Sequence, residues 1–251
     1  MKPRETLRVT VDAVPVDTVA SIGAIEEEIL TALTDSRPWL CTFVNPASTY
    51  LARGDPGFPQ TLQQFDRILP DGSGMVMAVR LLHQTNVARI SFDNTSLAPI
   101  VFHIVAEKGL TLAICGSTNE VAEQAAERIV EGFQVRPLAF DGYAGLDATV
   151  DRLLLAKPTI VVIGMGAPLQ ETVLLNLKAR GWQGVGFTCG GYIEQLAKRY
   201  QYYPPWVDRW NLRFAYRLYQ EPGRLWRRYL LQYPQFVARL GQEMVTRKMG
   251  R

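Results

Sequence analysis

Residues 41–74, CTFVNPASTYLARGDPGFPQTLQQFDRILPDGSG, decide the fold, because two short apolar runs there each stop abruptly at turn-forming residues. The first run, 40–44, ends at Asn45, which precedes a proline and is therefore disfavoured in a helical conformation. The second run, 65–69, ends at the Pro-Asp-Gly turn that contains Asp71. Side chains just past the carboxyl ends of strands line the ligand crevice of an open α/β sheet, so we expect Asn45 and Asp71 to share one mouth.

Asp71 allows two interpretations. Pro-Asp-Gly is a common turn, and aspartate often caps the helix that follows, here expected over 73–82. A carboxylate at a strand end can instead accept a proton from an attacking hydroxyl, as a general base does. Spacing alone favours the turn, and the rest of the chain has to decide between the two.

Composition describes an ordinary globular protein. The 251 residues, 47% hydrophobic and 20% charged, suit one large α/β domain or a domain with an appendage. Three widely spaced cysteines form neither a disulfide framework nor a zinc site, and the only histidines, His83 and His103, are expected to be structural. No segment approaches the ~20 apolar residues of a membrane span, so we expect a cytoplasmic protein.

Charge separates the chain into two parts. Residues 198–251 hold 12 Lys and Arg against three acidic residues, which is +9, whereas residues 1–197 carry 15 − 21 = −6. We therefore expect an α/β domain over 1–197, which holds the candidate site residues Asn45 and Asp71, and a basic helical appendage over 198–251.

Apolar periodicity predicts regular alternation of helices and strands. The expected strands are 8–11, 14–16, 40–44, 65–69, 110–115, 135–140, 159–163 and 184–189. The expected helices are 17–33, with Asp17 as N-cap, then 73–82, 98–108, 120–130, 147–156 and 167–179. Strands separated by helices imply right-handed crossovers, so we predict a Rossmann-like, mostly parallel sheet with helices on both faces.

Glycines end three of these strands: Gly116, the pair around Met165 that includes Gly166, and Gly190 with its neighbour. Glycine turns let backbone N–H groups approach a diphosphate, which suits a nucleotide-sugar donor. Neither GxGxxG nor GxxxxGK[ST] occurs, so the dinucleotide fingerprint and the P-loop are excluded.

Three more polar residues are candidates for the site. Arg89, in ARISFDNTS, is either a surface arginine or an anion clamp near the crevice. Glu171 lies in the first turn of an expected helix, where an acidic residue favours the helix dipole. Gln170 beside it could hydrogen-bond a sugar hydroxyl or amide.

The tail is aromatic as well as basic. Twelve of the 25 aromatic residues fall within 200–236, interleaved with arginines, and a Glu-Pro-Gly break separates two expected helices. Such a surface can be core packing, a segment in a bilayer interface beside anionic lipid, or a nucleic-acid contact. The acidic body argues against nucleic acid. An exposed aromatic face could also pack between subunits of a homo-oligomer.

In this order, the motifs FVNPAS, LPDGSG, ARISFDN, VIGMGAPLQE and WNLRFAYRLYQEPGRLWRRYL resemble the WecG/TagA/CpsF glycosyltransferases, family 26. The likeness runs from about Val9 to Tyr229. It implies an inverting, metal-independent transfer of a sugar from a UDP-sugar to a polyprenyl-diphosphate-linked sugar, at the cytoplasmic membrane face, for cell-surface polysaccharide. No cofactor is implied beyond the donor itself.

The same resemblance assigns roles to residues. Asp71 is the general base it implies, and Arg89 and Gln170 are associated with substrate. A membrane-targeting appendage would add an arginine to the site, from the set Arg217, Arg224 and Arg228.

The chain also departs from the family pattern. The threonine expected two residues before Asn45 is Phe43, with Thr42 adjacent, and the lysine common before Gln170 is Leu169. The donor is therefore expected to differ from N-acetylmannosamine. A non-catalytic protein that binds a nucleotide sugar or assembles partners at the membrane is the alternative.

Overall fold

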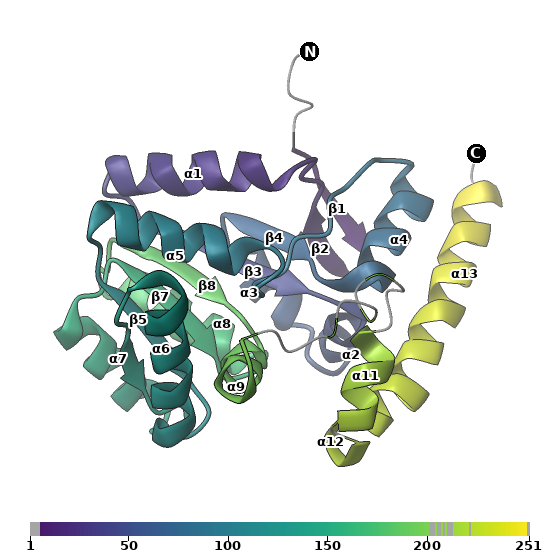
Figure 1. The fold of residues 1–251 in the computed structure, drawn as a ribbon. Coiled ribbons are helices and arrows are strands. Elements are labelled where there is room, and N and C mark those ends of the chain that lie inside the picture. Colours follow the sequence, from purple (N-terminus) through teal and green to yellow (C-terminus); the bar gives the residue numbers. More distant parts are fainter. Residues whose placement is uncertain are drawn as a thin grey trace.

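The computed structural model describes residues 6–200, 204, 207, 209, 213–220 and 222–249, and it confirms the α/β fold (Figure 1). Six parallel strands form one sheet in the order β4-β3-β8-β7-β5-β6. They are β3 (Trp39–Val44), β4 (Arg67–Pro70), β5 (Leu112–Gly116), β6 (Leu138–Phe140), β7 (Ile160–Gly164) and β8 (Val185–Thr188). A separate antiparallel hairpin consists of β1 (Arg8–Val11) and β2 (Val14–Asp17).

Helices cover both faces of the sheet, as predicted (Figure 1). One face packs against α1 (Ile22–Thr34), α5 (Leu97–Lys108), α6 (Asn119–Phe133) and α9 (Tyr192–Lys198). The other packs against the hairpin, α2 (Pro46–Gly54), α3 (Phe58–Gln63), α4 (Gly72–His83), α7 (Leu146–Ala156) and α8 (Leu169–Ala179). Because strand side chains alternate between faces, the apolar runs read from the sequence are buried on both sides.

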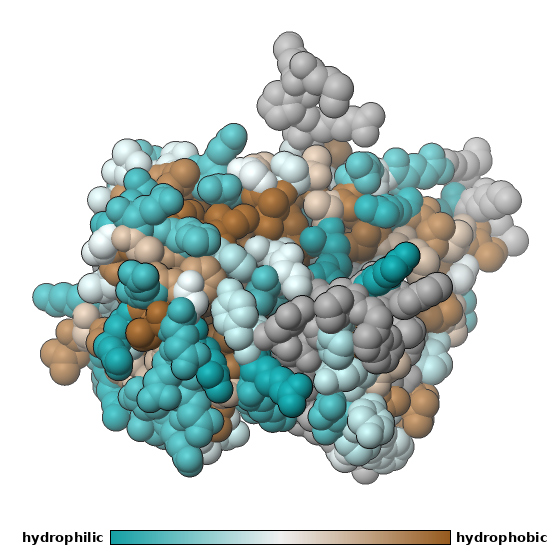
Figure 2. Space-filling model, in the orientation of Figure 1, coloured by the Kyte–Doolittle hydropathy of each residue, from teal (hydrophilic) through white to brown (hydrophobic). Residues whose placement is uncertain are grey.

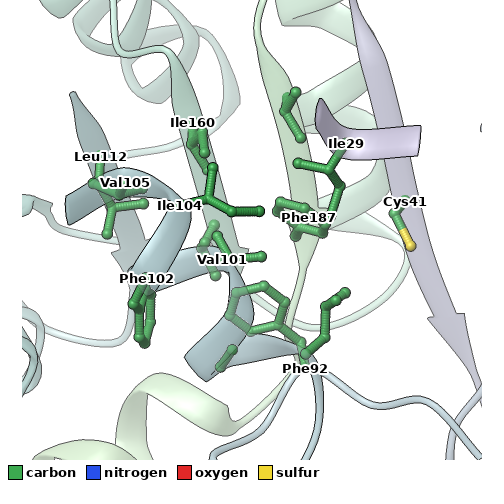
Figure 3. Close-up of a cluster of buried hydrophobic side chains, with 14 of the residues drawn as sticks. Ile29, Cys41, Phe92, Val101, Phe102, Ile104, Val105, Leu112, Ile160 and Phe187 are labelled. Atoms are coloured by element: carbon green, nitrogen blue, oxygen red, sulfur yellow. The ribbon is translucent and has the colours of Figure 1, made fainter. Parts of the chain in front are cut away.

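Aromatic packing fills the first of these faces. Phe187 of β8 lies between Ile29 of α1 and Phe92 of the loop between α4 and α5 (Figure 3). The ring centroids of Phe92 and Phe187 are 5.1 Å apart, and Phe92 also meets Tyr192 of α9 edge to face at 5.6 Å. This cluster fixes the α4–α5 loop against the end of β8.

The N-cap predicted at Asp17 is wrong. Asp17 is the last residue of β2 and only 1% exposed. Helix α1 begins at Ile22, and its N-cap residue is Ser21. Its carboxylate accepts hydrogen bonds from Arg8 Nε at 2.8 Å and from the backbone N–H of Ile68 at 2.8 Å. Asp17 therefore joins the hairpin to β4.

The last helix packs on the α/β body. Beyond α11 (Arg213–Gln220), α12 (Pro222–Arg227) and the π-helical turn η1 (Arg228–Gln232), α13 (Tyr233–Met249) lies against α2 and α4 (Figure 1). Phe236 and Leu240 of α13 are buried in the same cluster as α4. Arg247 donates to the backbone oxygen of Leu82 at 3.1 Å. Core packing thus accounts for this part of the tail.

The structure describes the first part of the tail only in part. Two helices are present as predicted, one ending at Gln220 and the next beginning at Pro222, but Pro222 and Gly223 of the expected break belong to the second helix. The side chains of Trp206, Trp210 and Phe214 lie outside the described residues. In the described part of the chain, none of the helices has the length and apolar composition needed to cross a bilayer.

Candidate active site

The sheet lines up the candidate residues along its carboxyl edge. In strand order they are Asp71 after β4, Asn45 after β3, Gly190 after β8, Gly166 after β7 and Gly116 at the end of β5. At about 4.8 Å between neighbouring strands, the row spans about 19 Å. The two polar residues occupy one end and the glycines the other.

A crevice is expected where neighbouring strands send the chain to opposite faces of the sheet. The strands β3 and β8 are such neighbours, because β3 continues into α2 on one face and β8 into α9 on the other. Thr42 and Thr188 lie on these two strands, directly below the switch. The fold therefore places the candidate residues where such a crevice is expected.

Asp71 occupies the N-cap position of α4, yet its side chain does not cap the helix. Its Oδ1 accepts a hydrogen bond of 2.5 Å from the hydroxyl of Ser91, which lies in the α4–α5 loop. Its backbone N–H donates to the oxygen of Val44 at 2.8 Å and extends the pairing of β3 and β4. Among the described residues no donor reaches Oδ2 of this half-buried carboxylate.

Asn45 has a clear local role. Its side-chain oxygen accepts from the backbone N–H of Ala47 at 3.0 Å, and its own N–H donates to Ser48 Oγ at 3.1 Å, which makes a capping box for α2. A Cβ on Gly74 would lie 3.2 Å from Pro46 Cγ, so the first turns of α2 and α4 approach closely. Asn45 and Asp71 consequently share one corner of the edge.

Four buried polar side chains form a hydrogen-bond network at the carboxyl ends of β3 and β8. Thr42 of β3 donates to Glu171 Oε1 at 2.9 Å and pairs with the hydroxyl of Thr188 at 2.9 Å. Gln170 Nε2 donates to the same Glu171 oxygen at 2.9 Å, and Gln170 Oε1 accepts from the backbone N–H of Gly190 at 3.2 Å. The network connects β3, β8, the first turn of α8 and the turn after β8.

Glu171 is the member of this network whose burial is energetically unfavourable, because its carboxyl can ionise. It is 1% exposed, and its Oε2 has no hydrogen-bond partner among the described residues. Burial raises the pKa of its carboxyl, while hydrogen bonds from Gln170 and Thr42 act in the opposite direction. These side chains are buried and bond to one another, so direct contact of Thr42, Gln170 and Glu171 with substrate stays a prediction.

Arg89 lies in the loop that also supplies Ser91. Its guanidinium is 3.4 Å from Asp93 Oδ2 and 3.4 Å from Thr95 Oγ1, and the side chain is partly exposed. A phosphate bound there would have to compete with Asp93. On the far side of the loop, the hydroxyl of Tyr192 donates to Asn94 Oδ1. The loop thus bridges the end of β4 and helix α9.

The glycines at the strand ends have different roles in the structure. A Cβ on Gly116 would lie 2.5 Å from the carbonyl oxygen of Gly164, so close packing of β5 on β7 requires this glycine. Gly166 has a φ of +77° and open space where a Cβ would be. Gly190, with a φ of +55°, has the same open space, so of these glycines Gly166 and Gly190 leave room for a ligand to approach the backbone.

The remaining predicted arginines are placed only by their backbone. Arg217 lies in α11, Arg224 in α12 and Arg228 in η1, and their side chains are outside the described part of the chain. Their contribution to the site stays a prediction. Ser91 and Thr188 were not predicted as site residues, although Ser91 lies in the quoted ARISFDN motif and Thr188 is the lone hydroxyl in an apolar strand.

Comparison with known proteins identifies the family of this chain. The sequence profile described as "Glycosyl transferase WecG/TagA/CpsF family" matches residues 9–250. The chain belongs to this family. It is a glycosyltransferase, as its sequence motifs predicted.

Curated relatives of this glycosyltransferase have named activities. It is 30% identical over 209 residues, 80% of this chain and 85% of the relative, to a UDP-Gal:alpha-D-GlcNAc-diphosphoundecaprenol beta-1,4-galactosyltransferase of Shigella boydii. It is 28% identical to an N-acetylglucosaminyldiphosphoundecaprenol N-acetyl-beta-D-mannosaminyltransferase of Bacillus spizizenii, covering 77% of this chain and 75% of that one. A Bacillus subtilis enzyme of the same name is 27% identical, over 82% and 80%.

Proposed function

We propose that this glycosyltransferase moves a sugar from a UDP-sugar to N-acetylglucosamine carried on a polyprenyl diphosphate, as a step in making a cell-surface polysaccharide. The names of the relatives support this, because they share the acceptor, N-acetylglucosaminyl-diphosphoundecaprenol, and differ in the sugar transferred. UDP-galactose is the donor to test first, since the chain departs from the family pattern at Phe43 and Leu169.

The reaction we propose is one in-line displacement with inversion. A lone pair of the acceptor hydroxyl oxygen forms the new bond to the anomeric carbon, the bond from that carbon to the diphosphate oxygen breaks, and UDP leaves with the electron pair. The hydroxyl proton passes to Asp71. A β-linked product from an α-linked UDP-sugar requires this stereochemistry, and the names of the relatives describe β-linked products.

The surroundings of Asp71 suit the role of base. The hydrogen bond from Ser91 holds Oδ1 and so orients the carboxylate, which leaves Oδ2 for the acceptor hydroxyl. This single observation carries the assignment, because a capping aspartate would direct its oxygens at the first turn of α4 instead. Ser91 is accordingly a positioning residue.

Positive charge has to balance the departing diphosphate. We propose that Arg89 contributes it together with an arginine of the tail, Arg217, Arg224 or Arg228, and that no metal ion is needed. The basic tail would also hold the enzyme, as a peripheral protein, at the anionic cytoplasmic surface where a lipid-linked acceptor resides.

The decisive assay incubates the protein with UDP-sugars and N-acetylglucosaminyl-diphosphoundecaprenol and identifies the linkage of the product. We expect Asp71→Asn to lower kcat by about 10²–10⁴-fold. Asp55→Asn is the matched control, because Asp55 is exposed beyond α2 and should leave kcat unchanged. Wild-type turnover by Asp71→Asn would remove the base. UDP binding without turnover on any acceptor would instead support a non-catalytic binding protein.

A further inference from the structure

An apolar groove of about 310 Å³ lies between α4 and α13. Every residue along it is hydrophobic, proline or glycine. The lining residues are Pro46, Gly74, Met77, Leu81, Tyr233, Phe236, Val237, Leu240, Gly241 and Met244. On α4 they recur at positions 74, 77 and 81, and on α13 at 233, 237, 240 and 244, so one stripe of each helix faces the groove.

Two residues at one end of the groove are close in the chain to the candidate active site. Pro46 directly follows Asn45, and Gly74 is three residues after Asp71, so the inner end lies at the corner of the sheet edge that holds the proposed base. From Gly74 to Leu81 it runs about 10 Å along α4, at 1.5 Å per residue. Arg247 binds the C-terminal end of α4 beyond it.

The rim of the groove exposes several large apolar side chains. Met77 is 54% exposed, Leu81 46% and Val237 61%. Figure 2 shows hydrophobic residues at the surface over α4 and α13, at the right of the view. Exposed apolar surface of this kind marks a place that a partner protein, a membrane or an apolar ligand covers.

We propose that this groove binds the first isoprenoid units of the acceptor, next to its diphosphate. The inference rests on the proposed function, in which the acceptor is a sugar diphosphate on a polyprenyl chain. Such a ligand is polar at the reacting end and apolar beyond it, which matches the change from the Asp71 corner to the groove. The flexible thioethers of Met77 and Met244 can adapt to the branched shape of an isoprenoid.

Gly241 offers a sharp test, because a Cβ there has open space within 4 Å and the residue lies within α13. Gly241→Leu should fill the groove without straining the helix. Two acceptors are compared in detergent, with the same N-acetylglucosaminyl diphosphate on a polyprenyl chain or on a butyl group. We expect the variant to lower kcat/KM about tenfold for the polyprenyl acceptor and to leave the butyl acceptor within about twofold.

Ala238→Leu is the matched control, because it adds the same bulk to an exposed position of α13 that does not line the groove. Equal losses on both acceptors, or no loss on either, would overturn the groove assignment. Two further measurements identify other occupants. Weaker binding of Gly241→Leu to anionic phospholipid vesicles without acceptor would assign the groove to bulk lipid, and a dimer that Gly241→Leu dissociates would assign it to a second copy. Failure of the wild type to convert either acceptor would instead overturn the proposed function.

Discussion

Glu171 should make the folded protein less stable as the pH rises. Its carboxyl is buried under the crevice with one oxygen unpartnered, and burial raises its pKa above the ordinary value of 4.5. Between the two pKa values the folded chain keeps a proton that the unfolded chain has lost. Unfolding therefore releases a proton, and the free energy of unfolding falls as the pH increases through this range.

Glu171→Gln isolates the contribution of this carboxyl, because glutamine has almost the same shape and does not ionise. The free energy of unfolding of the variant minus that of the wild type should increase by about 1.4 kcal/mol for each pH unit between the unfolded and folded pKa values. Above the folded pKa the difference should become constant. Thr42→Val removes a donor to this carboxyl, so it should raise the pKa and widen the range.

Urea unfolding followed by tryptophan fluorescence at pH values from 4 to 8 measures this difference. Glu123→Gln is the matched control, since Glu123 is exposed on α6 and is hydrated in both states. A difference for Glu171→Gln that stays flat across the range, or that falls as the pH rises, would show that this carboxyl is ionised as easily in the folded protein as in the unfolded chain. The reasoning from burial would then be wrong.

Three other outcomes can be measured directly. Phe236→Ala should lower the free energy of unfolding by about 3–5 kcal/mol, because Phe236 is 3% exposed in the cluster under α13; Val237→Ala, on the exposed side, should change it by at most about 0.5 kcal/mol in the same urea experiment. Asp17→Ala should cost about 2–3 kcal/mol, since it leaves the N–H of Ile68 without its partner, and an unchanged urea midpoint would contradict this. Transfer activity should survive dialysis against EDTA, and recovery of a lost rate by Mg²⁺ would show that a metal is needed.

The sheet could be predicted because its strands are buried on both faces. Runs such as 112–116 and 160–164 are apolar throughout and stop at glycine, so their positions and parallel direction follow from local sequence and the helices between them. The pairing of β3 with β8 could not be read this way, because their partners are more than 140 residues apart. The relation of Thr42 to Thr188 depends on that pairing.

Other features depend on partners that are distant in the sequence. Asp17 has the composition of a helix N-cap, and only the N–H of Ile68, 51 residues away, shows why it lies in a strand instead. The helices α2 and α3 were not predicted, since prolines and glycines in 46–63 indicate turns. The docking of α13 on α4 was only one of the alternatives left open by the sequence, because aromatic and basic residues at helical spacing fit a membrane surface as well as a core.

The glycine end of the sheet has a consequence for protein engineering. The backbones of Gly116 and Gly164 are in close contact, so the side chain of any larger residue at Gly116 would clash with the carbonyl oxygen of Gly164 at the end of β7. A library that seeks a new donor sugar should leave these two positions unchanged, keep Ser91 because it positions Asp71, and randomise Arg89 and the tail. The range of donor sugars can then change without disturbing the pairing of β5 with β7 on which the sheet depends.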